Sequence, residues 1–252
     1  MMTSPKHYTL FISDLHLDEA EPKITEAFKS IIKNVASNAD AVYILGDLFE
    51  IWPGDETDTA LSQTVISQLQ QLQQHVPTYF MRGNRDFMIG KKFIQATGIT
   101  LLDDPTVIDL YGTPTLLTHG DLLCTLDKKY QYFRRIVQHP LIKKLLYCLP
   151  LSTRQHLFGK VRRYSEDTNK QRDLTIMDVT ESAVIEMMKK YNVKHMIHGH
   201  THRPKIHNVP LPGLPHCDNG GKRIVLGAWH DKPSTLIVTK NNELLLEPTY
   251  TS

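Results

Sequence analysis

The stretch HMIHGHTHRPKI, residues 195–206, places four histidines and an arginine within nine positions. Residues 193–199, VKHMIHG, overlap its first half and have the apolar pattern of a short buried strand that ends in glycine. His200 and His202 are therefore expected just past the carboxyl end of a strand. Imidazoles gathered in this way suit a metal site, provided that other strands supply the remaining ligands.

Four further apolar runs have the pattern of buried strands, at residues 8–13, 41–46, 77–83 and 113–120. A lone polar residue at a strand end is usually a cap or part of a turn. Here, however, possible metal-ligating residues follow all five predicted strands, and this repetition favours a common site. Because the carboxyl ends of adjacent strands in an α/β sheet converge in one crevice, we expect these side chains to meet. The side chains concerned are Asp14, His16, Asp47, Asn84, His119, His200 and His202.

The residue types in this set indicate which metal ions it can bind. Carboxylate, amide and imidazole groups without thiolate suit a hard or borderline divalent ion such as Mn²⁺, Fe²⁺ or Zn²⁺. No cysteine lies at these turns, which argues against a structural zinc site built on thiolates. Seven ligands are too many for one ion, so two ions that share a carboxylate are expected, the arrangement that hydrolyses phosphoryl compounds.

The rest of the chain predicts an α/β fold. Apolar spacing of three and four residues favours helices at residues 22–37, 58–75 and 175–191, between the predicted strands. The runs at 223–229 and 234–248 read as closing strands, the second as a hairpin that turns at Asn241 and Asn242. A length of 252 residues fits one domain, residues 1–252, with an insertion.

The insertion is expected in a basic segment. Residues 127–172 contain twelve Lys and Arg against three acids, a local charge of +9 in a chain whose net charge is +2. The segment from about residue 126 to 163 has helical character with a break near Pro150, and leucines lie among its cations. One interpretation is a solvated face; the other is a surface that meets anionic lipid or an acidic amphiphile.

Few features of the sequence indicate the cellular compartment of the protein. The three cysteines, Cys124, Cys148 and Cys217, form no CxxC pair and imply no disulfide framework, so a reducing, cytoplasmic location is the simplest reading. The first apolar run is too short for a signal peptide, and no stretch approaches the roughly 20 apolar residues of a membrane span.

Five motifs together resemble the calcineurin-like metallophosphoesterase superfamily. They are DLH (14–16), GDLFEIW (46–52), GNRD (83–86), THGD (118–121) and HGHTHRP (198–204). With SxxxN at 165–169 and IMDV at 176–179, the chain is similar, more narrowly, to the diphosphatases that cleave UDP-2,3-diacylglucosamine in the lipid A synthesis of Gram-negative bacteria. This resemblance implies a two-sheet αββα sandwich with an inserted helical lid, here at residues 122–165.

The resemblance also implies how the metal ligands divide. One ion would be held by Asp14, His16, Asp47 and His202, and the other by Asp47, Asn84, His119 and His200, so that Asp47 bridges them. Two Mn²⁺ ions are expected, with iron or zinc as alternatives. His198 matches no ligand position and is expected to be structural.

Arg85 is the expected catalytic residue beside the metals. Many phosphodiesterases of this superfamily have histidine at this position, which can protonate an alkoxide leaving group. Arginine keeps its proton at neutral pH, so the site suits a leaving group that needs none, such as a phosphate monoester. Arg85 would then stabilise charge on the phosphoryl oxygens. The alternative is a surface ion pair between Arg85 and Asp86.

The substrate contacts that the resemblance implies include Arg172, which stands where the family pattern has lysine. The apolar residues of the basic segment could face acyl chains or could pack the lid on the core; these are Leu141, Leu145, Leu146, Leu149, Leu157 and Phe158. The substrate-binding residues implied are Asn84, Arg85, Asp127, Ser165, Asn169, Arg172 and His200.

The expected reaction is hydrolysis of UDP-2,3-diacylglucosamine by attack at its α-phosphorus, which gives UMP and 2,3-diacylglucosamine 1-phosphate. The expected location is the cytoplasmic face of the inner membrane, with no nucleic acid and no obligate protein partner. One alternative is a phosphodiesterase or nuclease of the same superfamily, although the basic segment is richer in aliphatic than in base-stacking aromatic residues. Another is a non-catalytic scaffold on the same fold.

Overall fold

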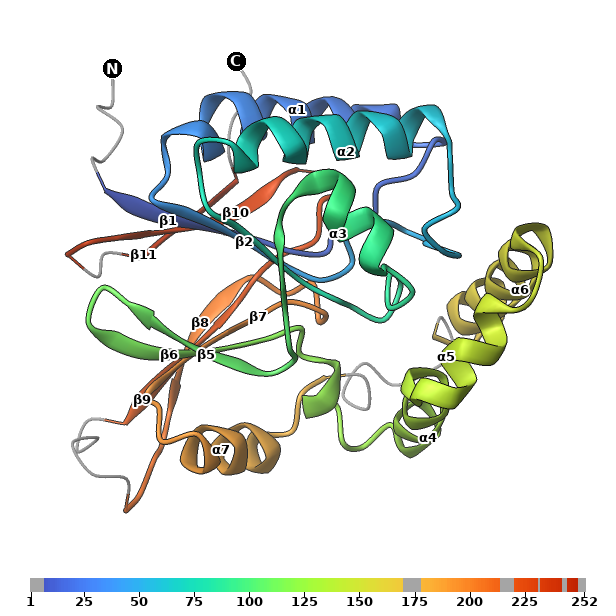
Figure 1. Cartoon of the computed structure of the whole chain (residues 1–252). Helices are drawn as coiled ribbons and strands as arrows, with labels where there is room; N and C mark the ends of the chain where they lie inside the picture. The colour runs from blue at the N-terminus through green and yellow to red at the C-terminus, as the bar shows by residue number, and fades with distance from the viewer. Residues whose placement is uncertain (1–6, 170–177, 214–219, 231, 242–243, 249–252) are drawn as a thin grey trace.

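Two β-sheets lie face to face between layers of helices (Figure 1). The computed structural model describes residues 7–169, 178–213, 220–230, 232–241 and 244–248, with the backbone alone for 166–169 and 245–248. The first sheet is built from β1 (Tyr8–Ile12), β2 (Ala41–Leu45), β3 (Thr78–Met81), β4 (Thr100–Leu102), β10 (Ser234–Thr239) and β11 (Leu244–Pro248). The second is built from β5 (Thr106–Leu110), β6 (Thr113–Thr118), β7 (His195–His198), β8 (Lys205–Val209) and β9 (Gly221–Val225).

Each sheet has a parallel centre and antiparallel edges. The first runs in the order β11-β10-β1-β2-β3-β4, with β1 to β4 parallel, and β10 and β11 form the predicted antiparallel hairpin. The second runs β5-β6-β7-β9-β8, with β6, β7 and β9 parallel. All five predicted ligand-bearing strands are thus parallel strands, but they are divided between two sheets rather than gathered in one.

Side-chain alternation along the strands produces separate apolar layers. In β1, Leu10 and Ile12 point to the helices, whereas Phe11 points between the sheets. In β7, Ile197 joins Phe11 in the layer between the sheets, and Met196 packs toward α7 (Glu181–Lys190). Both faces of each sheet are therefore covered, which accounts for the nearly continuous apolar runs in the sequence.

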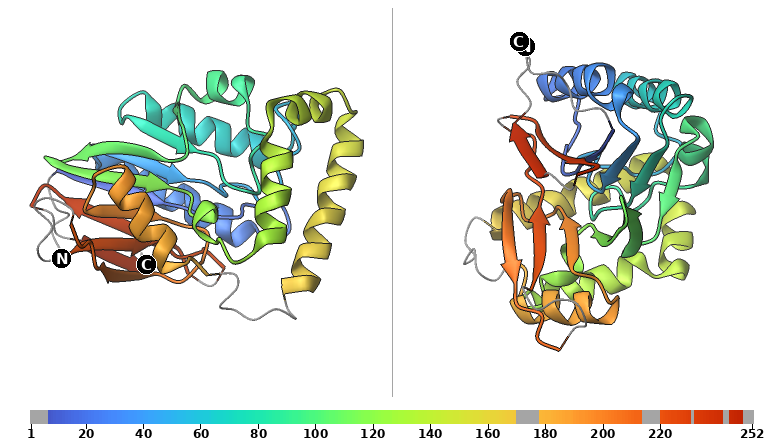
Figure 2. Two further views of the ribbon diagram at one scale, coloured as in Figure 1. Left: turned by 90° about the horizontal axis from the view of Figure 1, so that it is seen from below. Right: turned by 90° about the vertical axis from the view of Figure 1, so that its left-hand side faces the viewer.

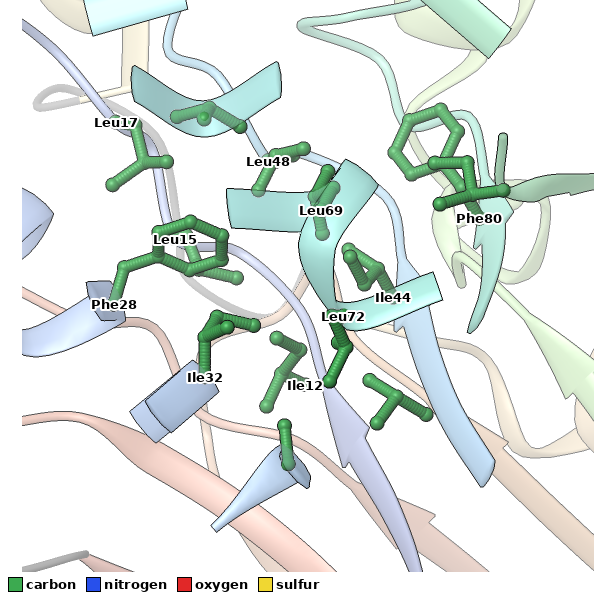
Figure 3. Packing of buried hydrophobic residues seen from close by; sticks show 14 of the residues in the cluster. Ile12, Leu15, Leu17, Phe28, Ile32, Ile44, Leu48, Leu69, Leu72 and Phe80 are labelled. Atoms are coloured by element: carbon green, nitrogen blue, oxygen red, sulfur yellow. The ribbon is translucent and has the colours of Figure 1, made fainter. Parts of the chain in front are cut away.

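Helices α1 (Pro22–Asn34), α2 (Ala60–Gln73) and α3 (Lys91–Thr97) cover the outer face of the first sheet (Figure 1). Figure 3 shows Phe28 and Ile32 of α1 and Leu72 of α2 packed around Ile12 and Ile44 of the strands beneath. Helix α7 covers the outer face of the second sheet. The layers run helix, sheet, sheet, helix, so the predicted αββα class is confirmed.

The basic part of the chain forms three helices beside the sandwich, α4 (Lys128–Gln138), α5 (Pro140–Tyr147) and α6 (Leu151–Asn169), called here the helical segment (Figure 2). The predicted break near Pro150 separates α5 from α6. A second break, not predicted, lies at Pro140, which opens α5 at the position where its missing N–H costs nothing.

The helical segment is fixed to the core by buried polar contacts. Arg154, which is 2% exposed, donates to Pro53 O at 2.6 Å and pairs with Glu56 Oε2 at 3.1 Å. Arg134 of α4 pairs with Asp121 at 2.6 Å. These contacts hold α4 and the start of α6 against the core.

Several short elements were not predicted from the sequence, namely α3, β4, β5 and β8. The predicted strand at 223–229 ends earlier, because β9 stops at Val225. Part of the predicted helix at 175–191 and part of the turn at Asn241 and Asn242 lie outside the described residues. Among the helices that the structure describes, none has the length and apolar character needed to cross a membrane.

Candidate metal centre

The seven predicted ligands come together where the carboxyl edges of the two sheets meet. Asp14 and His16 follow β1, Asp47 follows β2, and Asn84 follows β3 in the first sheet. His119 follows β6 in the second sheet, and His200 and His202 follow β7. Hydrogen bonds join these loops: His16 N donates to Asp47 O at 3.0 Å, and Gly199 N donates to His119 O at 2.9 Å. The centre therefore belongs to both sheets.

Two groups of side chains could each hold an ion. Asp14, His16 and His202 form one group, and Asp47, His119 and His200 form the other, with ligand atoms within 4.8 Å of one another in each group. Asn84 joins the second group, because its Oδ1 lies 3.0 Å from both His119 Nε2 and His200 Nδ1.

The Asp47 carboxylate lies between the two groups. Its Oδ2 is 3.9 Å from His16 Nε2 and 3.7 Å from His119 Nε2, and only 2% of the residue is exposed. Its other oxygen accepts the backbone N–H of Arg85 at 2.8 Å, which fixes the plane of the carboxylate. This position is the one that a bridging ligand would need.

The backbone at the centre adopts an uncommon conformation. Eight described non-glycine residues have positive φ, and five of them are candidate ligands. The five are Asp14, His16, Asp47, His200 and His202, with φ between 52° and 69°. Left-handed geometry is unfavourable for side chains with a Cβ and concentrates at functional sites. The fold thus holds these residues where local preference alone would not.

Two motif glycines leave room for the carboxylates. A Cβ at Gly83 would lie 2.1 Å from Asp47 Oδ1, and a Cβ at Gly199 would lie 2.2 Å from Asp14 Oδ2. Any larger residue would collide with a group of the centre. The glycines of GNRD and HGHTHRP are therefore required by close approach.

The donor set fits divalent ions. His119 Nδ1 lies 2.9 Å from Leu45 O, and His16 Nδ1 lies 2.8 Å from Glu50 Oε2. Both Nε2 atoms therefore face the centre. A histidine that ligates a metal is commonly oriented in this way, by a hydrogen bond from its other ring nitrogen to a carbonyl or carboxylate. Burial and the nearby His119 lower the pKa of His200 to about 4, which keeps that imidazole in its ligating form. Burial by itself would lower the pKa of His119. The negative charges of Asp47 and Asp14 outweigh burial and raise this pKa to about 9, so the centre favours positive charge.

His198 belongs to neither group of candidate ligands. It is fully buried, with Nδ1 2.8 Å from Gly199 O and Nε2 3.1 Å from an Arg223 guanidinium nitrogen. Burial and Arg223 lower the pKa of His198 to about 3, so it stays neutral. Its contacts support the loop that carries His200.

Arg85 faces a cavity rather than Asp86. Asp86 is fully buried and accepts the backbone N–H groups of Gly83 and Leu48 at 2.7 and 2.8 Å. The alternative of a surface Arg85–Asp86 pair is therefore wrong. Arg85 lines the cavity beside the candidate metal ligands, with Glu50 Oε1 3.8 Å from its Nε.

The cavity has a volume of about 870 Å³ and extends from the candidate ligands to the helical segment. The predicted substrate residues Asn84, Arg85, Asp127, Ser165 and His200 all line it. The Asn169 side chain and Arg172 lie outside the described residues. Apolar walls come from Phe87 on the core and from Phe133, Val137, Val161 and Tyr164 on the helical segment.

The six apolar residues singled out from the sequence do not line this cavity. Leu146 and Phe158 pack against the core, which is the packing alternative. Leu141 and Leu145 are 65% and 64% exposed, and Leu149 and Leu157 also face outward. The rotation of each helix about its own axis decides which side chains line the cavity, and in these helices other residues than the six face it.

Sequence reasoning missed a buried polar group under the cavity. Asp121, 1% exposed, accepts Tyr130 Oη at 2.7 Å and Arg134 Nε at 2.6 Å, and the Tyr130 ring stacks on His200 at 6.0 Å between centroids. The signal was present in THGD, whose aspartate was not assigned a role. The stacking partner could not be found from spacing, because Tyr130 lies 70 residues before His200.

The class of protein follows from comparison with known families. The model of the calcineurin-like phosphoesterase family matches residues 7–204, which include all seven candidate ligands. The chain therefore belongs to the calcineurin-like phosphoesterase family and is a hydrolase.

Similar curated proteins identify the branch of that family. The chain is 50% identical over 240 residues to a Coxiella burnetii protein named UDP-2,3-diacylglucosamine hydrolase, covering 95% of this chain and 97% of the relative. It is 49% identical over 242 residues to the protein of that name from Pectobacterium carotovorum, covering 95% and 99%. It is 47% identical to that of Yersinia pestis, again over 242 residues. Within the family, the chain belongs with the UDP-2,3-diacylglucosamine hydrolases.

A solved structure supports the fold alone. A dimetal phosphatase from Danio rerio is 14% identical, with a TM-score of 0.52, covering 98% of this chain and 100% of that one.

Proposed function

We propose that this chain hydrolyses the pyrophosphate bond of UDP-2,3-diacylglucosamine, giving UMP and 2,3-diacylglucosamine 1-phosphate in lipid A synthesis. The observation that carries the proposal is one cavity that joins the candidate metal ligands to apolar walls on the helical segment. A substrate in which a diphosphate joins a nucleoside to a sugar with two acyl chains matches both parts. The names of the relatives point to the same substrate.

The metal ions would be held as the geometry suggests. Asp14, His16 and His202 would hold one and Asn84, His119 and His200 the other, with Asp47 shared. Two divalent ions, which we take to be Mn²⁺, supply a nucleophile from water and neutralise charge on the phosphoryl group.

The chain's own residues would set the remaining chemistry. Arg85 would bind the phosphoryl oxygens with its guanidinium and offset charge that grows as the bond breaks. It need not give up a proton, because the leaving phosphate monoester has a second pKa of about 6. Attack at the α-phosphorus would release the sugar 1-phosphate.

The helical segment would act as the lid of a single domain, with residues 122–165 as the insertion. Lys129, Arg134 and Lys160 line the cavity and would attract the diphosphate. Phe133 and Val161 would cover acyl chains and keep water from the reacting group. Asn169 and Arg172 remain predicted contacts at the end of this segment.

The outer face of the helical segment favours a membrane surface. Leu141, Leu145 and Tyr132 are more than 60% exposed among lysines and arginines, a composition that binds anionic lipid. We place the protein at the cytoplasmic face of the inner membrane, where an acylated substrate would be found. We propose neither a nucleic acid nor an obligate protein partner.

A substrate panel tests the proposal against its rivals. Turnover of UDP-2,3-diacylglucosamine is measured beside bis-p-nitrophenyl phosphate and single-stranded DNA, in ¹⁸O-labelled water. We expect the lipid to be strongly preferred and the label to appear in UMP. Preference for DNA or the simple diester would favour a phosphodiesterase or nuclease, and label in the sugar phosphate would move the attack to the other phosphorus. A protein purified with almost no metal and no turnover would be a scaffold.

A further inference from the structure

A buried carboxylate behind the cavity contacts both the core and the helical segment. Glu50, in the loop after β2, is 5% exposed, and its Oε2 lies 2.8 Å from His16 Nδ1. Its other oxygen, Oε1, forms an ion pair with Arg162 of α6. The same oxygen lies 3.8 Å from Arg85 Nε. Two guanidinium groups, one from the core and one from the helical segment, therefore share one carboxylate oxygen.

The two arginines differ in where they stand. Arg85 lines the cavity, whereas neither Glu50 nor Arg162 does. The wall of the cavity on α6 is formed instead by Lys160, Val161, Tyr164 and Ser165. Arg162 is thus placed to act on the site through Glu50 rather than by direct contact with a substrate.

The position of Arg162 depends on how α6 is seated. Arg154, which is buried against Pro53 and Glu56, fixes the start of the helix. Arg162 follows eight residues later, about 12 Å along the helix at 1.5 Å per residue. With α6 held at its base and Phe158 packed on the core, Arg162 reaches the Glu50 carboxylate.

We propose that Glu50 is a positioning residue for which Arg162 and Arg85 compete, so that seating of α6 leaves Arg85 available to the phosphoryl group. A buried carboxylate needs a cation, and losing one partner is costly. When Arg162 is on Glu50, Arg85 stays at the long distance of 3.8 Å and faces the cavity. Without Arg162, Glu50 would draw Arg85 away from the substrate. This inference rests on the proposed function in taking Arg85 as the group that binds phosphate.

A set of variants tests this competition. We expect Arg162→Ala to lower kcat for bis-p-nitrophenyl phosphate by about tenfold, the size of one charge-assisted contact. Adding Glu50→Gln to Arg162→Ala should restore most of this loss, because an amide no longer captures Arg85 but can still accept a proton from His16 Nδ1. Arg162→Lys keeps the charge and should remain within a few-fold of wild type. Arg163→Ala, on the exposed side of α6, is the matched control.

Two readouts do not depend on turnover. The dissociation constant of orthophosphate, measured by calorimetry, should weaken about tenfold in Arg162→Ala and recover in the double variant. Metal content should be equal to wild type in Arg162→Ala; a loss of metal would overturn the proposal by placing Arg162 in metal binding. Activity and phosphate binding equal to those of Arg163→Ala, or no recovery with Glu50→Gln, would also overturn it. Failure of the wild-type protein to cleave the lipid would sink only the proposed substrate, because neither probe contains lipid.

Discussion

At the scale of single residues, the centre is held in conformations that its side chains do not prefer. Five candidate ligands have positive φ, and the packing of two sheet edges keeps them there. The same packing surrounds Asp14 and Asp47 with imidazoles and excludes water from both carboxylates. Buried carboxylates of this kind persist when a cation compensates them, which is consistent with a two-ion site.

Replacing Asp47 tests the shared ligand. Because its carboxylate lies between both groups, Asp47→Ala should remove turnover and lower metal content at both positions, measured by elemental analysis and steady-state kinetics. Asp103→Ala, an exposed carboxylate away from the site, should behave as wild type. Two retained metal ions with near-normal turnover would contradict the bridging assignment.

At the scale of elements, the helical segment presents different faces to the cavity and to solvent. Phe133 and Val161 come from α4 and α6 and line the cavity together, although 28 positions separate them in the sequence. Leu141 and Leu145 of α5 face outward. The break at Pro140 sets this division, because it turns α5 away from the line of α4.

The double variant Phe133→Ala with Val161→Ala tests the acyl-contact role of the inner face. Burying one apolar side chain contributes about 1.5–3 kcal/mol, so kcat/KM for the diacyl substrate should fall roughly tenfold to a hundredfold or more. Cleavage of bis-p-nitrophenyl phosphate should change by only a few-fold, since that compound has no acyl chain. Leu141→Ala with Leu145→Ala, assayed in detergent, is the matched control. Equal losses on both substrates would show that the inner face only supports the fold.

At the scale of the whole molecule, the candidate metal centre draws its side chains from both sheets. Asp14, Asp47 and Asn84 come from the first sheet, and His119 and His200 from the second. Ions bound between them would link the halves of the sandwich and stabilise the native state by mass action.

Removing divalent ions should therefore lower the unfolding temperature. At an ion concentration one hundred times its dissociation constant, binding contributes about 2.7 kcal/mol per site. With two such sites in a chain of this length, we expect a fall of about 10–20 °C on addition of a chelator, measured by calorimetry. Asp47→Ala should respond less, because it holds less metal to lose. An unfolding temperature that does not change with chelator would show that the centre does not connect the sheets energetically.

The sequence by itself determined the alternation of strands and helices and which strand ends carry the candidate ligands. Strand and ligand positions are local signals: an apolar run, then Gly or Ser, then Asp, Asn or His, as at Asp47 and Asn84. Such positions can be recognised because the alternation of side chains along a strand and the residue types of a turn depend only on residues that are close in the chain. The meeting of His200 and His202 with the other candidate ligands followed from those signals, whereas the two-sheet αββα class followed from the resemblance.

Only the tertiary structure decided how the strands divide between two sheets and which face of each helix meets the cavity. Leu146 turned out to pack on the core, while Phe133 and Val161 line the cavity, because small rotations of α4, α5 and α6 relative to the sandwich choose the inward stripe. Glu50 gained its partner Arg162 from 112 positions away. Such contacts depend on the placement of whole elements, which the spacing of residues along one chain does not encode.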